Sequence, residues 1–165
     1  MRPSKIDLVN AKETDWVNSS FYMMIFGTVY AFDPNLVKKF NATEDNDDRI
    51  HETIHVRQAE GLKDSWIRFY LHYFWQWICN ISLITVNIRA PYMFMPTEIE
   101  AYGKQDNPDY IWVYDSDGRS HSICDNWRKL KQVPKKHLKD LAKQWYGGDK
   151  NKMTFTQFIK KHFSF

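Results

Sequence analysis

The stretch from residue 64 to residue 86, DSWIRFYLHYFWQWICNISLITV, is apolar enough to be mistaken for a membrane-spanning helix. Polar residues nevertheless recur at every fourth position and form one stripe along a helix: Asp64, Arg68, His72, Gln76 and Asn80. Five polar side chains are costly in lipid unless they are paired. The pattern therefore predicts one amphipathic helix buried in a globular core, and attachment to a membrane surface stays open as an alternative.

The composition is that of a single globular protein rather than a disulfide scaffold or a disordered chain. With 165 residues, of which 43% are hydrophobic, the chain is long enough to bury a core without disulfides. Its two cysteines, Cys79 and Cys124, make no disulfide framework and fit a reducing compartment. The N-terminal residues lack the apolar run of a secretory signal, so we expect a cytoplasmic location.

Charge is distributed unevenly along the chain. Residues 1–127 carry 12 Lys and Arg against 18 Asp and Glu, whereas residues Arg128 to Phe165 carry 11 against 2. This basic tail predicts a contact with nucleic acid, an acidic protein surface or anionic lipid. Its lysines also fit the solvated face of an amphipathic helix. No helix-turn-helix, zinc-finger or RNA-binding signature supports sequence-specific recognition.

Other segments predict a small β element followed by helices. Residues 19–34, aromatic and β-branched around Gly27, predict a strand or a hairpin that ends at Asp33 and Pro34. Residues 48–62 predict a helix that ends near Gly61.

The second half of the chain is predicted to be mainly helical. Residues 87–95, NIRAPYMFM, look extended, with Pro91 inside the segment and Pro96 directly after it. A helix is expected over 96–105 with Thr97 as a possible cap. A turn is expected at 115–119, and two basic helices are expected over 134–148 and 154–163. Leu138, Leu141, Ala142 and Trp145 share one face of the first basic helix, and Thr154 with Gln157 resembles a capping box at the start of the second.

The motif RIHETIHVRQ, residues 49–58, carries the most specific chemical signal. On a helix, His51 and His55 lie one turn apart and can bind one zinc ion together. Glu52 projects roughly 100° around the helix, beside the metal, where it can take a proton from metal-bound water. The pattern H-E-x-x-H is typical of metallopeptidases, so zinc is the expected cofactor and Glu52 the expected general base.

A zinc hydrolase needs a third protein ligand and one position left open for water. Glu98 and Glu100 on the next compact helix are the candidates, and they lie about 200° apart around it, so only one can face the metal. Ala101 and Gly103 stand one turn after each of them, and either small residue would let the helices approach. Helix geometry therefore leaves Glu98 and Glu100 both open.

Three segments together resemble a known family. They are RIHETIHVRQ, the aromatic WIRFYLHYFWQWI, and PYMFMPTEIEAYGKQDNPDYI. In order and spacing they are similar to a family of small, largely uncharacterised zincin-like proteins of Bacteroidetes and their phages, and more broadly to the gluzincin metallopeptidases. The resemblance covers about residues 20–111. It implies an α+β, mostly helical zincin-like fold with a small N-terminal hairpin or sheet. It also implies that Glu98, followed by Ala101, is the third ligand.

From these patterns we expect a zincin-like domain over residues 1–112 and a basic helical extension over residues 113–165. Gln58 lies two turns past His51 and is a candidate to hydrogen-bond a ligand, and Tyr92, Tyr102 and His121 are candidates to stabilise an oxyanion. The expected function is zinc-dependent hydrolysis of peptide or amide bonds. The alternative is a non-catalytic structural or interaction protein, such as a phage particle component, that uses its basic tail to bind an assembly partner. The expected location is then within a phage particle.

Overall fold

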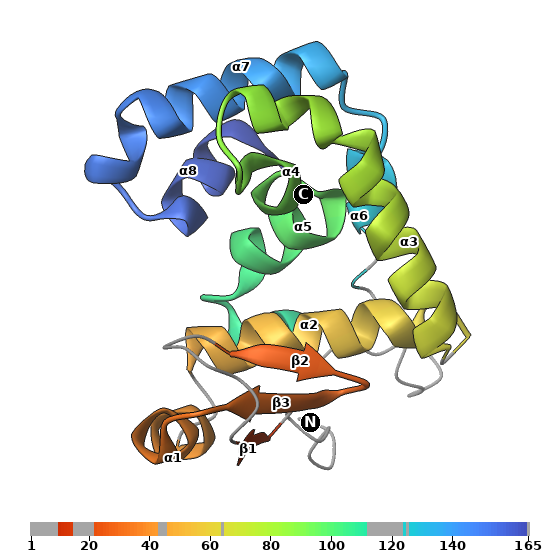
Figure 1. Cartoon of the computed structure of the whole chain (residues 1–165), viewed down its shortest axis with the longest axis vertical. Coiled ribbons are helices and arrows are strands. Elements are labelled where there is room, and N and C mark those ends of the chain that lie inside the picture. The colour runs from red at the N-terminus through yellow and green to blue at the C-terminus, as the bar shows by residue number, and fades with distance from the viewer. Residues whose placement is uncertain are drawn as a thin grey trace.

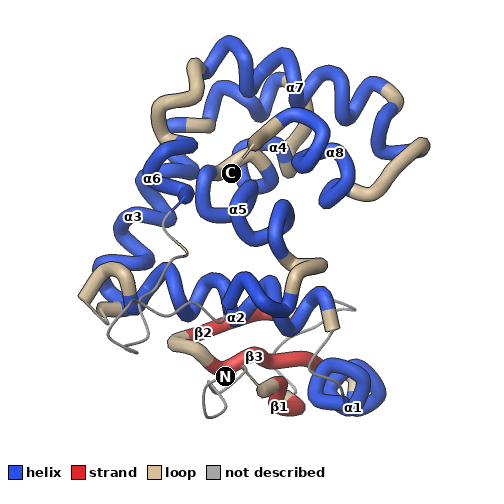
Figure 2. The backbone as a smooth tube through the Cα atoms, turned by 180° about the vertical axis from the view of Figure 1, so that it is seen from behind, coloured by secondary structure: helices blue, strands red, loops and turns tan. Residues whose placement is uncertain are grey.

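A computed structural model describes residues 10–14, 22–42, 46–63, 65–111, 124 and 126–164. Figure 1 shows a small sheet at one end, helix α2 (Asp47–Glu60) lying along it, and most of the other helices beyond α2. The same order is visible from behind, where the sheet and α1 (Pro34–Ala42) lie at the end opposite α7 (Lys135–Gly147) (Figure 2). The fold is thus mostly helical with a small N-terminal sheet, and the α+β prediction is confirmed.

The sheet contains the predicted hairpin and one strand that the sequence did not reveal. Strands β2 (Met23–Ile25) and β3 (Thr28–Ala31) are antiparallel, and β1 (Ala11–Glu13) pairs parallel to β3 on its other side. Phe26 and Gly27 form the turn with φ angles of 48° and 79°, both positive as a tight hairpin turn requires. The strand β2 is consequently an edge strand of the three-stranded sheet.

The motif helix forms where the sequence predicted it. Asn46 caps α2 by accepting a hydrogen bond from the Arg49 backbone N–H, and Asp47 and Asp48 occupy its first turn. Acidic groups stabilise this end of a helix because the unpaired backbone N–H groups are positive. Gly61 follows the last helical residue, as expected.

The aromatic stretch forms a helix, but the prediction that it is one buried helix through residue 86 is wrong. Helix α3 (Trp66–Cys79) ends before Asn80, and a 3₁₀ turn, η1 (Ile81–Thr85), follows. Gln76 and Asn80 from the polar stripe are buried, and Asn80 donates hydrogen bonds to the carbonyls of Pro91 and Phe94. Because part of the polar stripe faces inward, an apolar face of α3 is turned outward.

Two further predictions of local structure need correction. The segment 87–95 is not extended, since α4 (Ala90–Met93) forms there with Pro91 in its first turn, where the missing N–H costs nothing. Helix α5 (Pro96–Lys104) begins after Met95, and Thr97 is not its cap. The Thr97 hydroxyl instead donates to Oε1 of the buried Gln76.

The C-terminal helices pack on the middle of the chain. η2 (Pro108–Ile111) is followed by α6 (Asn126–Leu130), α7, η3 (Asp149–Asn151) and α8 (Phe155–His162). The predicted capping box at Thr154 and Gln157 is present, and the predicted apolar face of α7 is buried. One core cluster joins these helices to η1, α4 and α5. The predicted turn at 115–119 and His121 lie outside the described residues, and the domain boundary at residue 112 stays a prediction.

Truncating Phe158 should destabilise the protein strongly. This side chain is fully buried on α8 and contacts the rings of Phe94 and Trp145. We expect Phe158→Ala to lower the free energy of unfolding by about 3–5 kcal/mol, measured by urea denaturation. Phe32→Ala is the control, because Phe32 is 51% exposed and its removal should cost less than about 0.5 kcal/mol. Equal losses in the two variants would contradict this packing.

Candidate metal centre

Helix α2 presents both histidines of the motif on the face that meets α5. His51 and His55 are buried, with 6% and 4% of their surface exposed. Their rings lie edge to face with centroids 4.9 Å apart, and their Nε2 atoms are 3.2 Å apart. The i, i+4 spacing on one helix produces this convergence, as the motif predicted.

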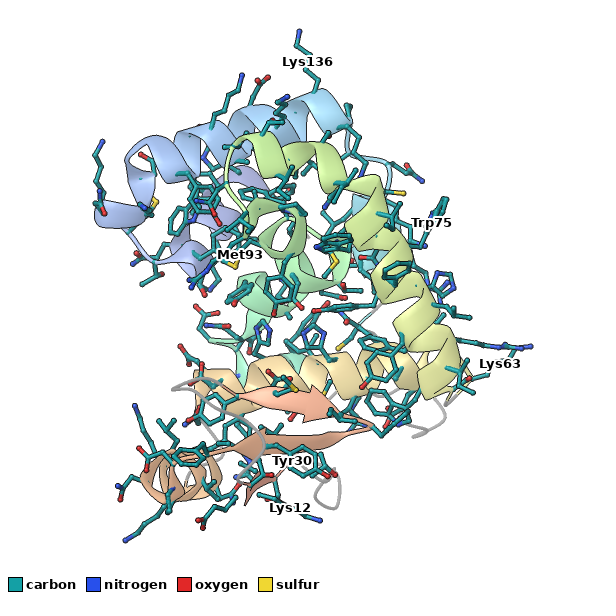
Figure 3. The ribbon with its side chains drawn as sticks, in the orientation of Figure 1. Lys12, Tyr30, Lys63, Trp75, Met93 and Lys136 are labelled. Atoms are coloured by element: carbon teal, nitrogen blue, oxygen red, sulfur yellow. The ribbon has the colours of Figure 1, made fainter. Side chains whose placement is uncertain are left out.

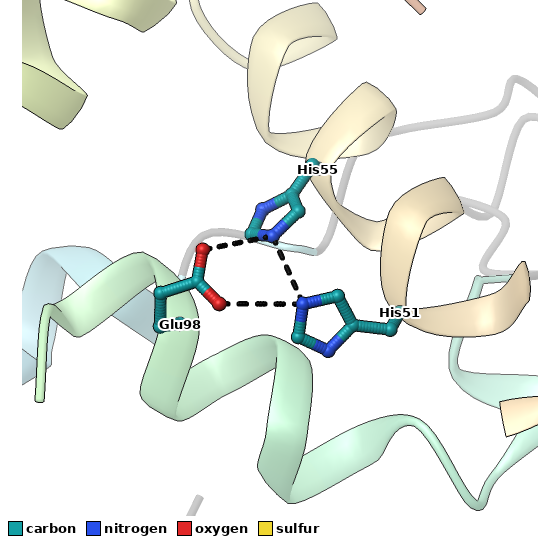
Figure 4. Close-up of side chains that lie close together, drawn as sticks. All are labelled: His51, His55 and Glu98. Carbon is teal, nitrogen blue, oxygen red and sulfur yellow. Dashed lines mark hydrogen bonds and ion pairs between the residues drawn. The ribbon is translucent and has the colours of Figure 1, made fainter. Parts of the chain in front are cut away.

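Glu98 on α5 completes a three-residue group with the two imidazoles (Figure 4). Its Oε2 atom lies 3.3 Å from His51 Nε2, and its Oε1 atom lies 3.2 Å from His55 Nε2. Ligand bonds of about 2.0–2.1 Å in a tetrahedral zinc site place neighbouring ligand atoms about 3.3 Å apart. The two Nε2 atoms, and each Nε2 atom with its nearer Glu98 oxygen, have separations close to this value, so the three residues could hold a metal ion in a tetrahedral site.

Two glutamines fix the orientation of the imidazole rings. Oε1 of Gln58 lies 2.9 Å from His55 Nδ1, and Oε1 of Gln105 lies 3.0 Å from His51 Nδ1. An amide oxygen only accepts, so each Nδ1 carries a proton and each Nε2 faces Glu98. When both rings are neutral, two nitrogen lone pairs and a carboxylate converge in a buried place, an arrangement that favours a bound cation.

The electrostatics of the group agree with this preference for positive charge. Burial acts to lower the pKa of His55, but the adjacent Glu98 carboxylate outweighs it and raises that pKa to about 9. Burial likewise acts to raise the pKa of Glu98, yet the neighbouring histidines hold it well below its usual value. Glu98 is therefore an anion at neutral pH, which is the state a metal ligand needs.

Glu100 lies on the opposite side of α5 and serves a different purpose. Its carboxylate accepts hydrogen bonds from the Tyr110 hydroxyl at 2.6 Å and from the Asn126 backbone N–H at 3.0 Å. It also accepts from Gln58 Nε2 at 2.7 Å, which orients the Gln58 amide so that Oε1 faces His55. Helix geometry alone allowed either Glu98 or Glu100 to face the metal. In the structure Glu98 lies beside the imidazoles, whereas Glu100 orients Gln58, which contacts His55.

A cavity of about 700 Å³ opens beside the three ligand atoms. Glu52, Tyr92 and Tyr102 line it together with Met23 and Met24 of the edge strand β2. Burial raises the pKa of Glu52, although the two histidines act to lower it. The three candidate ligand residues thus border a cavity large enough for a ligand. Glu52, whose pKa is raised, lies on the wall of the same cavity.

Two contacts of the site were not predicted from the sequence. The Tyr73 hydroxyl on α3 donates to Glu98 Oε1 at 2.5 Å, and Gln105 binds His51 as described above. Gln105 is seven residues after Glu98, two helical turns on, so its spacing could have predicted a place on the same face. Nothing in the sequence predicted the contact of Tyr73, because that contact depends on how α3 is rotated. His72, in contrast, packs on Trp127 away from the site.

Known proteins give no further guidance. Neither the family models, nor the curated proteins, nor the solved structures contain a match to this chain. The structure itself therefore carries the assignment, which is a buried His51, His55 and Glu98 group that could hold a metal ion.

Removing one imidazole should abolish metal binding. We expect the unaltered chain to purify with stoichiometric metal and His55→Ala to purify without it, because two ligands in a buried site hold zinc poorly. Inductively coupled plasma mass spectrometry of the purified proteins measures this. His72→Ala is the matched control and should keep its metal. Metal retained in His55→Ala would show that the ion binds elsewhere.

Removing the hydrogen bond that orients His55 should weaken metal binding without abolishing it. We expect Gln58→Ala to raise the dissociation constant for zinc about 10–100-fold, since the ring loses its fixed orientation. Competition with a chromogenic chelator gives that constant. Gln144→Ala is the control, because Gln144 also hydrogen-bonds a carboxylate, that of Asp149, but on the exposed surface. An unchanged constant in Gln58→Ala would contradict the positioning role.

Proposed function

We propose that the protein is a zinc-dependent hydrolase that acts on peptide or amide bonds. The observation that carries the proposal is the convergence of three residues in a buried group beside a cavity: the Nε2 atoms of His51 and His55 are 3.2 Å apart, and each lies 3.2–3.3 Å from one oxygen of the Glu98 carboxylate. The resemblance of three sequence segments to zincin-like proteins supports the same reaction. His51, His55 and Glu98 would hold the zinc, which in such sites polarises the scissile carbonyl and activates a water molecule.

Glu52 is the residue proposed to move the proton. It neighbours His51 on α2 and lines the cavity. A carboxylate whose pKa is raised accepts a proton from water more readily and can return it to a leaving amine. Burial supplies that shift for Glu52. The side chain thus combines the position and the proton affinity that a general base requires.

Two tyrosines are suited to stabilise the negative oxygen that forms during hydrolysis. Tyr92 and Tyr102 both line the cavity, and burial raises the pKa of each phenol well above its usual value. Both hydroxyls therefore keep their protons and act as hydrogen-bond donors. Tyr102 also packs its ring on His51, with centroids 4.4 Å apart, which restricts its movement.

The edge strand gives the cavity a means to hold an extended peptide. Among the described residues, β2 pairs with β3 alone, and Met23 and Met24 from β2 line the cavity. A peptide that adds to such an edge is held by main-chain hydrogen bonds, whatever its side chains are. The arrangement therefore favours a peptide as substrate over a small compact amide.

The proposal predicts that Glu52→Gln keeps zinc and loses hydrolysis. We expect at least about a hundredfold lower rate, because the amide cannot accept the proton. The assay is cleavage of an internally quenched peptide library by the zinc-loaded chain, with metal content measured alongside. Glu60→Gln is the control, since Glu60 lies on the same helix but pairs with Arg57.

Two results would overturn the proposal. Equal cleavage by Glu52→Gln and the unaltered chain would remove Glu52 from the mechanism. A zinc-loaded chain that cleaves no peptide, yet assembles stoichiometrically with a partner, would assign the zinc a structural role.

A further inference from the structure

Helix α3 carries a continuous apolar stripe on its outer surface. Ile67, Leu71, Phe74, Trp75 and Ile78 follow helical spacing, and their exposed fractions are 70%, 64%, 61%, 63% and 37%. Figure 3 shows the labelled Trp75 projecting away from the body of the molecule. Isolated exposed apolar residues are ordinary, but a stripe of neighbours along a whole helix indicates a contact surface.

Exposed apolar residues continue along the chain past the end of α3. In η1 and the turn after it, Ile81, Ile84 and Ile88 are 41%, 46% and 78% exposed. A contiguous apolar patch above a few hundred Å² is uncommon on a monomeric protein. These three residues with the five on α3 form what we name the outer apolar face.

The charge around this face is positive. From residue 65 to residue 97 the sequence holds no Asp or Glu, while it holds Arg68 and Arg89. Helix α6 adds Arg128 and, just after it, Lys131, both of which lie over the ring of Trp127. Trp127 in turn packs against His72 of α3. Cations thus border the helix within the segment itself and from a neighbouring helix.

This combination narrows the kind of partner. A second copy of the chain would bring the same cations together across the contact, which opposes self-association. Within the described ranges, no helix is long and apolar enough to cross a bilayer. An aromatic and aliphatic face with cations at its border is the pattern of helices that lie in the interface of an anionic membrane.

We infer that the outer apolar face binds the surface of membranes that contain anionic lipid. Trp75 and Phe74 would insert at the level of the headgroups, where aromatic side chains are favoured. Arg68, Arg128 and Lys131 would meet the negative headgroups. The contact of these five residues with lipid can be tested apart from the proposed hydrolysis, because none of them lines the cavity, whereas Ile88 at the end of the face does.

The test is flotation of the whole chain with lipid vesicles. We expect the unaltered chain to float with vesicles of phosphatidylcholine mixed with phosphatidylglycerol, and far less with phosphatidylcholine alone. The double variant Leu71→Gln with Trp75→Gln should bind the mixed vesicles at least about tenfold more weakly, since it removes two large apolar groups at unchanged charge. High salt should weaken binding of the unaltered chain, because ions screen the headgroups.

The controls separate this inference from folding and from catalysis. Phe32→Gln removes an exposed aromatic group on another part of the chain and should float as the unaltered protein does. The double variant should keep its metal and its melting temperature, since both replaced side chains are mostly exposed. Equal flotation of the double variant, no flotation of the unaltered chain, or equal binding to neutral vesicles would each overturn the inference. A dimer in light scattering that the double variant converts to monomer would overturn it in favour of self-association.

Discussion

The close packing of α2 against α5 is the contact on which the site depends. Ile50 and Ile54 from α2 and Ala101 from α5 are buried in one cluster, and the small alanine side chain permits the approach. The contact removes two imidazoles and a carboxylate from water together. Burial of a charge without a partner costs several kcal/mol, so the three groups are tolerated only as a set that shares a proton or an ion. The apolar contact and the polar group therefore have to form at the same time.

Further buried polar residues orient the side chains of this three-residue group through hydrogen bonds. Gln58 connects His55 to Glu100, and Glu100 is held in turn by Tyr110 and Asn126. Buried polar groups need hydrogen-bond partners, and these contacts supply them. The orientation of His55 is thus specified from residues as far along the chain as α6, which explains why the motif helix alone does not define the site.

The parts of the structure that were predictable are those governed by local rules. Signals at the helix ends predicted α2 and α8, and aromatic and β-branched residues around a glycine predicted a strand or a hairpin. The histidine pair followed from its spacing, whereas the choice of Glu98 over Glu100 required a resemblance, because both fit the same helix. The rotation of α3 was not predictable, since Gln76 and Asn80 look like solvent-facing residues until their partners Thr97, Pro91 and Phe94 are known. The contact of Tyr73 with Glu98 was missed for the same reason.

The turn of the hairpin joins the sheet to α3. The Phe26 backbone N–H donates to the Tyr70 hydroxyl at 3.0 Å, and a Cβ atom on Gly27 would lie 3.0 Å from the ring of Trp66. Gly27 also has a φ of 79°, in the left-handed region that favours glycine. Strand β2 and helix α3 both contribute to the wall of the cavity. Two elements that line the cavity are therefore joined at a single backbone position, where the absence of one methyl group lets segments from distant parts of the chain pack against each other.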